Sequence, residues 1–513
     1  MKKFKRMSDK VILHPMMTFI LLTAFVIVLS GILDLFGASV TYTSINSRTG
    51  NFTSTLITVD SLLSLSGIKY VFSTTVKNFA DFAPLSTLLI TLIGLGIMDR
   101  SGFLDTLFFI LTKKLNKTFV TFILVLLCLI FSITGDLTFV IFIPLSALLF
   151  KYGKRNPMAG IVTSFASLSL GYGINIGMSS IDSTLTNMTE IAASTITKNY
   201  SINTHCYIWI MLAALIFASI IITYITERIT VPKLGKYQDE EEIVEDKEKL
   251  TRKEKRGLLF AAIGCILYII FFIWNIIPNV PLGGNLLNYR EARYIDMLFG
   301  DNSFFADGYV FVITFLFFIA GFLYGLGSKN IENHRDVADY LGHSLDEIGK
   351  VIMLLFFGSL FISLLRYSKI GDLLTGLLTN GISNIGVGGI PLLVIVFVIS
   401  LITTPLLPSF AARWNILSSS VVPLMMTAGF SPEFAQLTFS SASSIGYALT
   451  PAMAYFVIYV AYMEKYGKKD VGTVKCIRLI HPYAISIAIV WLALLLLWYL
   501  VGLPLGISTA SVL

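Results

Sequence analysis

The stretch GYGINIGMSSID, residues 171–182, interrupts what would otherwise be one membrane-spanning helix. Residues 157–170 are apolar and small, and residues 183–195 can resume a helix. An unpaired backbone group in a bilayer costs several kcal/mol, so such a break must be packed inside protein or line a wet cavity. An acid at that depth, Asp182, indicates a functional site. The alternative is that the stretch is a loop end at the membrane surface.

The composition is that of an all-α polytopic membrane protein. Of the 513 residues, 55% are hydrophobic and only 13% are charged. The net charge of +7 comes largely from lysines that flank apolar segments, so it reports membrane topology and does not indicate nucleic-acid binding. The four cysteines show no CxxC spacing, and we expect no metal site and no disulfide from them.

The apolar segments predict nine membrane spans. The first ten residues carry five positive charges, which places the N-terminus in the cytoplasm and the C-terminus outside, in a multi-pass protein of the cytoplasmic membrane. The predicted spans are 15–37, 81–98, 157–190, 205–229, 257–276, 308–328, 349–366, 432–464 and 482–502.

Two further apolar segments predict re-entrant hairpins. Residues 118–150 have lysines at both ends and a polar tip at Gly135-Asp136, so this hairpin enters and leaves on the cytoplasmic side. Residues 389–426 form a second hairpin, which enters from outside. The broken helix 157–190 follows the first hairpin. A second broken helix, 432–464, follows the second hairpin and is predicted to be interrupted at Ser440–Pro451.

These landmarks repeat at a fixed spacing. The intervals that separate Gly102 from Asp136 and Asp182 are the same as those that separate Gly371 from Pro405 and Pro451. The shift that carries Gly102 onto Gly371 therefore superposes 81–229 on 347–502, and the two copies enter the membrane from opposite sides. Such an inverted repeat cradles substrate and ions near the bilayer midplane. The remaining units are an N-terminal span and loop (1–80), a cytoplasmic linker with two connecting spans (230–346) and a C-terminal tail (503–513).

The break residues offer chemistry for ion coupling. Asn175 provides an amide that suits an anion or a cation, and Asp182 can hold a proton or pair with a cation. Asp136 could do likewise, or could cap a helix. No nucleotide-binding loop is visible, so direct drive by ATP is not expected.

The chain resembles the p-aminobenzoyl-glutamate transporter (AbgT) family over nearly its whole length. The resemblance includes Asp99-Arg100-Ser101-Gly102, Gly135-Asp136, Asn175 with Asp182, and Gly429-Phe430-Ser431-Pro432. It implies a homodimer of nine-helix subunits with two hairpins. It also implies import of a folate breakdown product, or export of sulfonamide-like antimetabolites, driven by a gradient of H⁺ or Na⁺ with no other cofactor.

The chain departs from this family pattern where charge is expected. The family usually carries Arg, Asp and Asn where this chain has Ser440, Ser443 and Tyr447, and the hairpin serine three residues before Trp414 is Ala411. Either Arg366 or Arg413 could replace the lost cation, or both could snorkel to the outer interface. Trp414 could stack on an aromatic substrate or fill the hairpin core. The predicted substrate-binding set is Trp414, Asn175, Ser409, Arg413, Pro432, Ser440, Ser443, Tyr447 and Pro451.

We therefore expect a secondary transporter, and not an enzyme, that works by elevator-like or rocking movement. Its partners would be a small aromatic or amphiphilic substrate, the lipid bilayer and a second copy of the chain, without nucleic acid. The alternatives are a transporter of the same fold with a different substrate, an intramembrane aspartyl protease that uses Asp136 and Asp182, and a channel.

Overall fold

The computed structural model describes residues 13–45, 52–135, 137–175, 179–203, 205–237, 249–300, 303–346, 348–383, 386–467 and 471–512. The basic N-terminal decapeptide, the acidic part of the linker and Asp136 lie outside these ranges. Within them, eight helices are long and apolar enough to cross a membrane. Seven of these and the two broken helices correspond to the nine predicted spans, and the eighth is an arm of the first hairpin. The predicted all-α polytopic fold is confirmed, with two small sheets added.

The first half of the described chain contains one antiparallel sheet near its start, followed by a succession of helices. Its elements are α2 (Pro15–Leu35), β1 (Ser39–Ile45), β2 (Phe52–Thr58), α3 (Leu65–Ala80), α4 (Ala83–Arg100), α5 (Phe103–Lys114), α6 (Lys117–Phe131), the 3₁₀ turn η1 (Ser132–Thr134), α7 (Leu137–Tyr152), α8 (Pro157–Gly171), α9 (Ser180–Ala193), α10 (Ile208–Ile225), the π-helical turn η2 (Thr226–Thr230) and α11 (Val231–Leu234).

The second half repeats this order after four connecting helices, of which two are long and two are short. Its elements are α12 (Arg252–Ile276), α13 (Tyr294–Phe299), α14 (Phe304–Ser328), α15 (His334–His343), α16 (Ile348–Ser368), α17 (Ile370–Ser383), α18 (Gly389–Thr403), α19 (Phe410–Thr427), α20 (Pro432–Leu449), α21 (Phe456–Gly467), α22 (Thr473–Val501), β3 (Pro504–Gly506) and β4 (Thr509–Ala510).

The order α4, α5, hairpin, broken helix, α10 thus recurs as α16, α17, hairpin, broken helix, α22. The offset between the copies is not constant. Helices α5 and α17 begin at Phe103 and Ile370, and this step along the chain is shorter than the step from Pro157 to Pro432, where α8 and α20 begin. The single shift predicted from the sequence is therefore an average over copies whose turns differ in length.

The first broken helix lies where the sequence indicates. Helix α8 begins with Asn156 as its N-cap and Pro157 in the first turn, a combination that favours a helix start. It ends at Gly171. Helix α9 restarts after Ser179, whose hydroxyl accepts a hydrogen bond from the backbone N–H of Asp182, while the Asp182 carboxylate accepts one from Ser179. This capping box satisfies the orphan N–H groups of a helix start inside the protein.

The predicted interruption at Ser440–Pro451 is wrong in its position. Helix α20 continues through Ser440 to Leu449, and the break spans 450–455. Two of the serines in this stretch are accommodated because their hydroxyls bond to carbonyls of the same helix: Ser441 donates to Thr438 O and Ser444 to Ser441 O. Pro451 sets the end, since it lacks an N–H and biases Thr450 towards an extended backbone.

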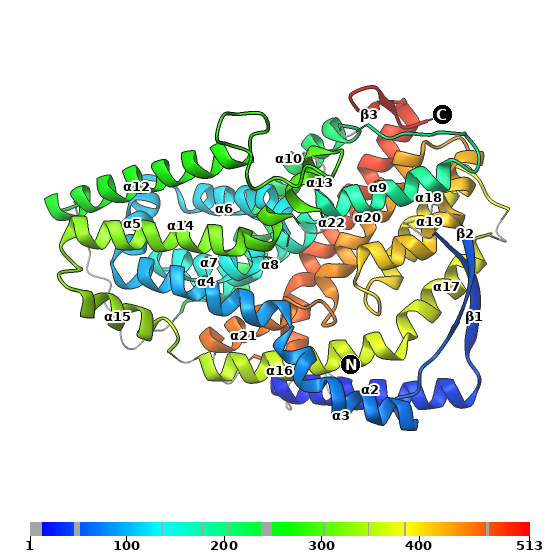
Figure 1. The fold of residues 1–513 in the computed structure, drawn as a ribbon, viewed down its shortest axis with the longest axis horizontal. Helices are drawn as coiled ribbons and strands as arrows, with labels where there is room; N and C mark the ends of the chain where they lie inside the picture. The colour runs from blue at the N-terminus through cyan, green and yellow to red at the C-terminus, as the bar shows by residue number, and fades with distance from the viewer. Residues whose placement is uncertain are drawn as a thin grey trace.

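Helices α8 and α20 lie at the centre of the molecule, each close to its own hairpin (Figure 1). A Cβ at Gly160 of α8 would stand 2.3 Å from the carbonyl oxygen of Ser146 in α7, and one at Gly446 of α20 would stand 2.6 Å from Thr404. Each broken helix therefore approaches its hairpin so closely that only glycine fits at the contact.

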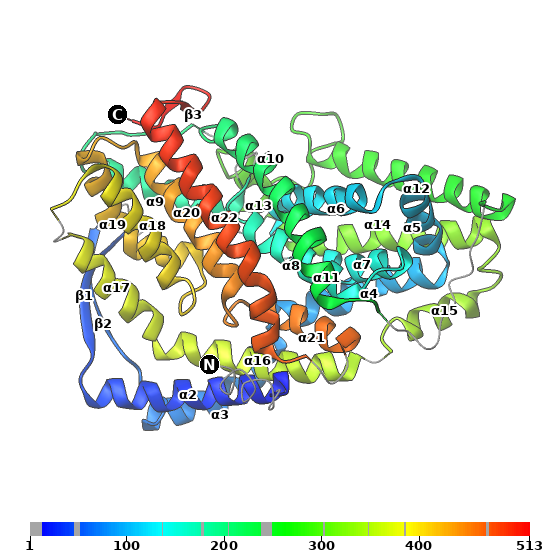
Figure 2. The same cartoon turned by 180° about the vertical axis from the view of Figure 1, so that it is seen from behind.

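The connecting elements form the two ends of the molecule. Helices α12, α14 and α4 pack side by side at one end, and the β1–β2 sheet stands at the other (Figures 1 and 2). That sheet makes three polar contacts, two with α19 of the second hairpin and one with α17. The Asn415 side chain accepts from the Ile45 N–H at 3.0 Å, Asn380 donates to the Thr41 carbonyl at 2.9 Å, and Ser419 donates to the Thr43 carbonyl.

Candidate functional site

A cavity of about 790 Å³ lies where the two repeats meet. Its lining comes from the first helix break and α9, from the loop that holds α13, from α16 and α17, from the second hairpin's tip, and from the end of α20 with the break that follows. Both helix breaks therefore reach one cavity, as an inverted repeat predicts.

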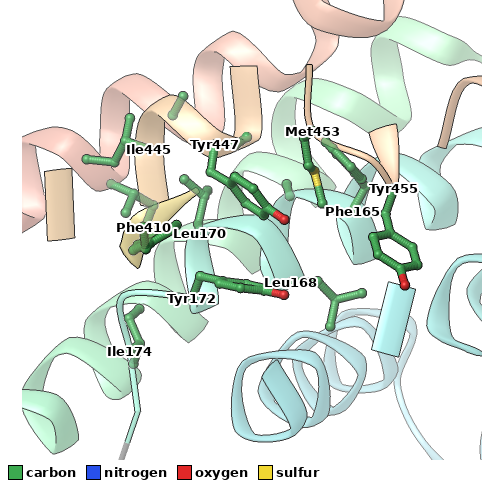
Figure 3. Close-up of a cluster of buried hydrophobic side chains, with 14 of the residues drawn as sticks. Phe165, Leu168, Leu170, Tyr172, Ile174, Phe410, Ile445, Tyr447, Met453 and Tyr455 are labelled. Carbon is green, nitrogen blue, oxygen red and sulfur yellow. The ribbon is translucent and has the colours of Figure 1, made fainter. Parts of the chain in front are cut away.

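Three aromatic rings form one wall of this cavity. Tyr172 comes from the first break, Phe410 from the start of α19 and Tyr447 from the end of α20. The ring centroids of Tyr172 and Tyr447 are 5.0 Å apart, and Phe410 lies 5.9 Å from Tyr172 and 5.8 Å from Tyr447. Figure 3 shows the two tyrosines one above the other, with both hydroxyl groups pointing the same way. We call Tyr172, Phe410 and Tyr447 the aromatic wall.

The cavity lining also carries charge. Arg366 and Asp372 contribute from α16 and α17, Glu291 from the loop before α13, and Asp296 from α13 itself. The described lining thus holds three carboxylates and one guanidinium, so its charge balance is acidic. Arg366 is exposed and interacts electrostatically with Asp372.

Asp182 and Asn175 are in direct contact across the first break. One carboxylate oxygen of Asp182 accepts from Asn175 Nδ2 at 2.9 Å, from Ser179 N at 3.0 Å and from Ser179 Oγ at 2.7 Å. Both residues are buried. The Oδ1 atom of Asn175 has no hydrogen-bond donor among the described residues. The break therefore holds a carboxylate beside an unsatisfied amide oxygen, which are the ligand types that favour a proton or a hard cation.

Arg413 is fully buried between the second hairpin and α20. Its Nη1 donates to Ser400 O at 3.0 Å, Thr404 Oγ1 at 2.7 Å and Ser443 Oγ at 2.8 Å. Its Nε and Nη2 atoms have no partner among the described residues. Arg413 therefore does not snorkel to the interface, whereas Arg366 is exposed.

Trp414 is fully buried and belongs to a polar chain behind the cavity lining. Its indole N–H donates to Thr189 Oγ1 at 2.9 Å, and Thr189 donates to Gln436 Oε1 at 2.7 Å. Gln436 then donates to Thr186 Oγ1 at 3.2 Å. The centroids of the Trp414 and Phe439 rings are 4.6 Å apart. These hydrogen bonds connect α19 to α9 and α20.

The other predicted residues divide between the cavity and the packed core. Ser409 lines the cavity and caps α19, and Tyr447 belongs to the aromatic wall. Pro432 occupies the first turn of α20, and Pro451 lies in the break after it. Ser443 binds Arg413, while the buried Ser440 hydroxyl has no partner among the described residues.

Sequence reasoning missed Tyr172, Phe410 and Thr189. The available signal was the helical spacing of Gln436, Ser440, Ser443 and Tyr447 along the chain. That spacing places them on one face of a continuous helix, and residues on the facing elements then become candidates. No cluster of three or more metal-ligating side chains occurs in the described ranges.

Comparison with known proteins agrees with this architecture. A family model described as the AbgT putative transporter family matches residues 3–513. The p-aminobenzoyl-glutamate transport protein of Escherichia coli (strain K12) is 28% identical over 502 residues, which make up 98% of this chain and 95% of the relative.

Two solved transporter structures resemble the chain over nearly its full length. The structure of Neisseria gonorrhoeae MtrF, described as illuminating a class of antimetabolite efflux pumps, shares 29% identity and covers 98% of each chain, with a TM-score of 0.50. That of the Alcanivorax borkumensis YdaH transporter shares 26% identity and covers 96% of this chain and 100% of YdaH, with a TM-score of 0.49. Because the family model spans almost every residue, and because the two broken helices and two hairpins meet at one cavity, this chain belongs to the AbgT family of membrane transporters.

Proposed function

We propose that the protein is an ion-gradient-driven secondary transporter, without enzymatic activity, in the cytoplasmic membrane. It would move p-aminobenzoyl-glutamate, a related aromatic or amphiphilic metabolite, or a sulfonamide-like antimetabolite. The observation that carries the proposal is the cavity of about 790 Å³ reached by both helix breaks and by the second hairpin's tip. A cavity bounded by discontinuous helices can change its access when one hairpin-bearing part moves.

The aromatic wall supports an aromatic substrate. Rings stack favourably at centroid distances of about 4.5–7 Å, and Tyr172 and Tyr447 already contact each other at 5.0 Å. A substrate ring could therefore stack on the exposed edge of this wall, with Ser409 available for a hydrogen bond. Trp414, Pro432, Ser440, Ser443 and Pro451 stay predicted contacts, for a state in which the hairpin has moved.

The first break supports ion coupling. Asp182 can bind and release a proton, or its carboxylate and the unpaired Oδ1 of Asn175 can share a Na⁺ ion. Asp136 stays a candidate for the same role.

We propose that the N-terminus is cytoplasmic and that the functional unit is a homodimer. Helix α12 could contact lipid or a second copy of the chain, because only 11% of its most apolar 18-residue stretch is buried within the protein.

Transport by purified protein in proteoliposomes tests this proposal. Labelled p-aminobenzoyl-glutamate should move at a saturable rate that rises with an imposed H⁺ or Na⁺ gradient and falls when an ionophore dissipates it. Empty liposomes are the control. A rate that ignores both gradients would contradict ion coupling, and a rate that never saturates would favour a channel. Saturable transport of other small solutes alone would support the same fold with a different substrate.

A further inference from the structure

The buried cation Arg413 has an excess of unused hydrogen-bonding capacity. A guanidinium carries five N–H donors and stays charged in proteins. Only Nη1 has partners here, so the single N–H on Nε and the two on Nη2 are left unpaired among the described residues. Buried polar groups normally have partners, and buried charges are normally paired with an opposite charge. The described residues give Arg413 no carboxylate partner.

The surroundings of Arg413 compensate its charge only in part. Ser400 O and Thr404 Oγ1 belong to the C-terminal end of α18, where the helix dipole is negative. The guanidinium carbon lies 5.3 Å from the centre of the Phe410 ring and 5.1 Å from that of Phe439. These rings add cation–π attraction, but neither they nor the carbonyl supply a full negative charge.

Arg413 is one aromatic layer away from the cavity. Phe410 contacts the guanidinium and also lines the cavity. Tyr447 lines the cavity from α20, one turn beyond Ser443, which accepts from Nη1. A ligand in the cavity would therefore approach Arg413 on the side of the Phe410 ring.

We infer that Arg413 is the anion-recognising residue of this transporter and that it selects an aromatic compound with a single carboxylate or sulfonate group. This inference rests on the proposed function, whose cavity it uses. A planar guanidinium binds such a group through two parallel N–H···O bonds, and Nε and Nη2 form the required pair. A single buried cation matches a single negative charge, and the acidic lining around Arg366 repels a second one.

Binding to purified wild-type protein gives the first test, with 4-aminobenzoate and its neutral amide, 4-aminobenzamide, as probes. The two differ in charge but hardly in shape. A hydrogen-bonded charge at a buried site corresponds to roughly a ten- to hundredfold difference in Kd. We expect the carboxylate to bind more tightly by that factor. Equal binding of both probes overturns the role of Arg413, whereas binding of neither contradicts the aromatic substrate class of the proposed function and this inference with it.

The second test uses substitutions. Arg413→Gln should abolish the preference for the carboxylate. The double variant Arg413→Gln/Ser440→Arg should restore part of it, because it places a cation on α20 about one turn from Ser443, which binds Arg413 of α19 in the wild type. Arg155→Gln is the matched control, because it also removes a buried guanidinium, one that pairs with Glu227 at 2.6 Å and does not line the cavity. It should keep the wild-type preference.

Preserved preference in folded Arg413→Gln would overturn the inference. If that variant does not fold, Arg413→Lys provides the readout: the carboxylate preference should fall, since an ammonium cannot bind in a bidentate manner. An undiminished preference in that variant would equally overturn the inference.

Discussion

Two aspartates in this chain occupy the same local structure in different surroundings. Asp182 and Asp336 are each the third residue of a helix and complete a capping box, with Ser179 and Asn333 respectively. Backbone N–H groups of Glu332 and Asn333 hold the pKa of Asp336 below its ordinary value. Asp182 has similar donors, but it is buried beside the unsatisfied amide of Asn175. A comparison of variants at Asp182 and Asp336 can therefore distinguish a role in helix capping from a role in ion coupling.

We predict that Asp182→Asn abolishes gradient-driven transport, because an amide cannot take up a proton or neutralise a cation. Asp336→Asn alters the same type of cap in α15, away from the cavity, and should leave transport close to wild type. Uptake into proteoliposomes, normalised to inserted protein, measures both. If Asp182→Asn transported like wild type, the acid would serve only to start α9.

At the scale of elements, the Trp414–Thr189–Gln436 chain joins the second hairpin to both broken helices. Thr189→Val should leave the Trp414 indole N–H and the Gln436 side-chain carbonyl oxygen without their partner. We expect this to lower the free energy of unfolding by roughly 2 kcal/mol. Thr438→Val is the matched control, since Thr438 is equally buried but donates only to Phe434 O of its own helix. Its cost should be below about 1 kcal/mol. Thermal unfolding in detergent compares the two, and equal midpoints would show that the chain does not tie the elements together.

The elements also show how far sequence reasoning reaches. Apolar length and flanking lysines predicted the spans, and Gly171–Asp182 predicted the first break, because glycines and a polar cluster have no other place in a bilayer. The second break was misplaced because a run of serines looks like a loop, although Ser441 and Ser444 in fact bond to carbonyls of their own helix. The aromatic wall could not be predicted, since Tyr172, Phe410 and Tyr447 meet only through tertiary packing. The unpaired state of Arg413 depends equally on which groups surround it.

At the scale of the whole molecule, the cavity reaches one side of the predicted topology. Its lining includes Glu291 and Asp296 from the loop between α12 and α14, and Arg366 from the end of α16. Flanking charges predict that both regions lie outside. We therefore propose that the structure is an outward-facing state, in which the aromatic wall separates the cavity from the cytoplasmic half.

This state predicts one-sided access to the second hairpin. In a background with Cys265→Ser, which removes the partly exposed native thiol, Ala411→Cys should react with a membrane-impermeant maleimide added from outside. Ala411 lines the cavity but does not cap a helix, so the substitution disturbs little. Ala338→Cys, on the exposed surface of α15, should react only from the cytoplasmic side and provides the control for sidedness. A saturating substrate should protect Ala411→Cys, because both occupy one cavity. Reaction of Ala411→Cys from the cytoplasmic side alone would invert the assignment and make this the inward-facing state.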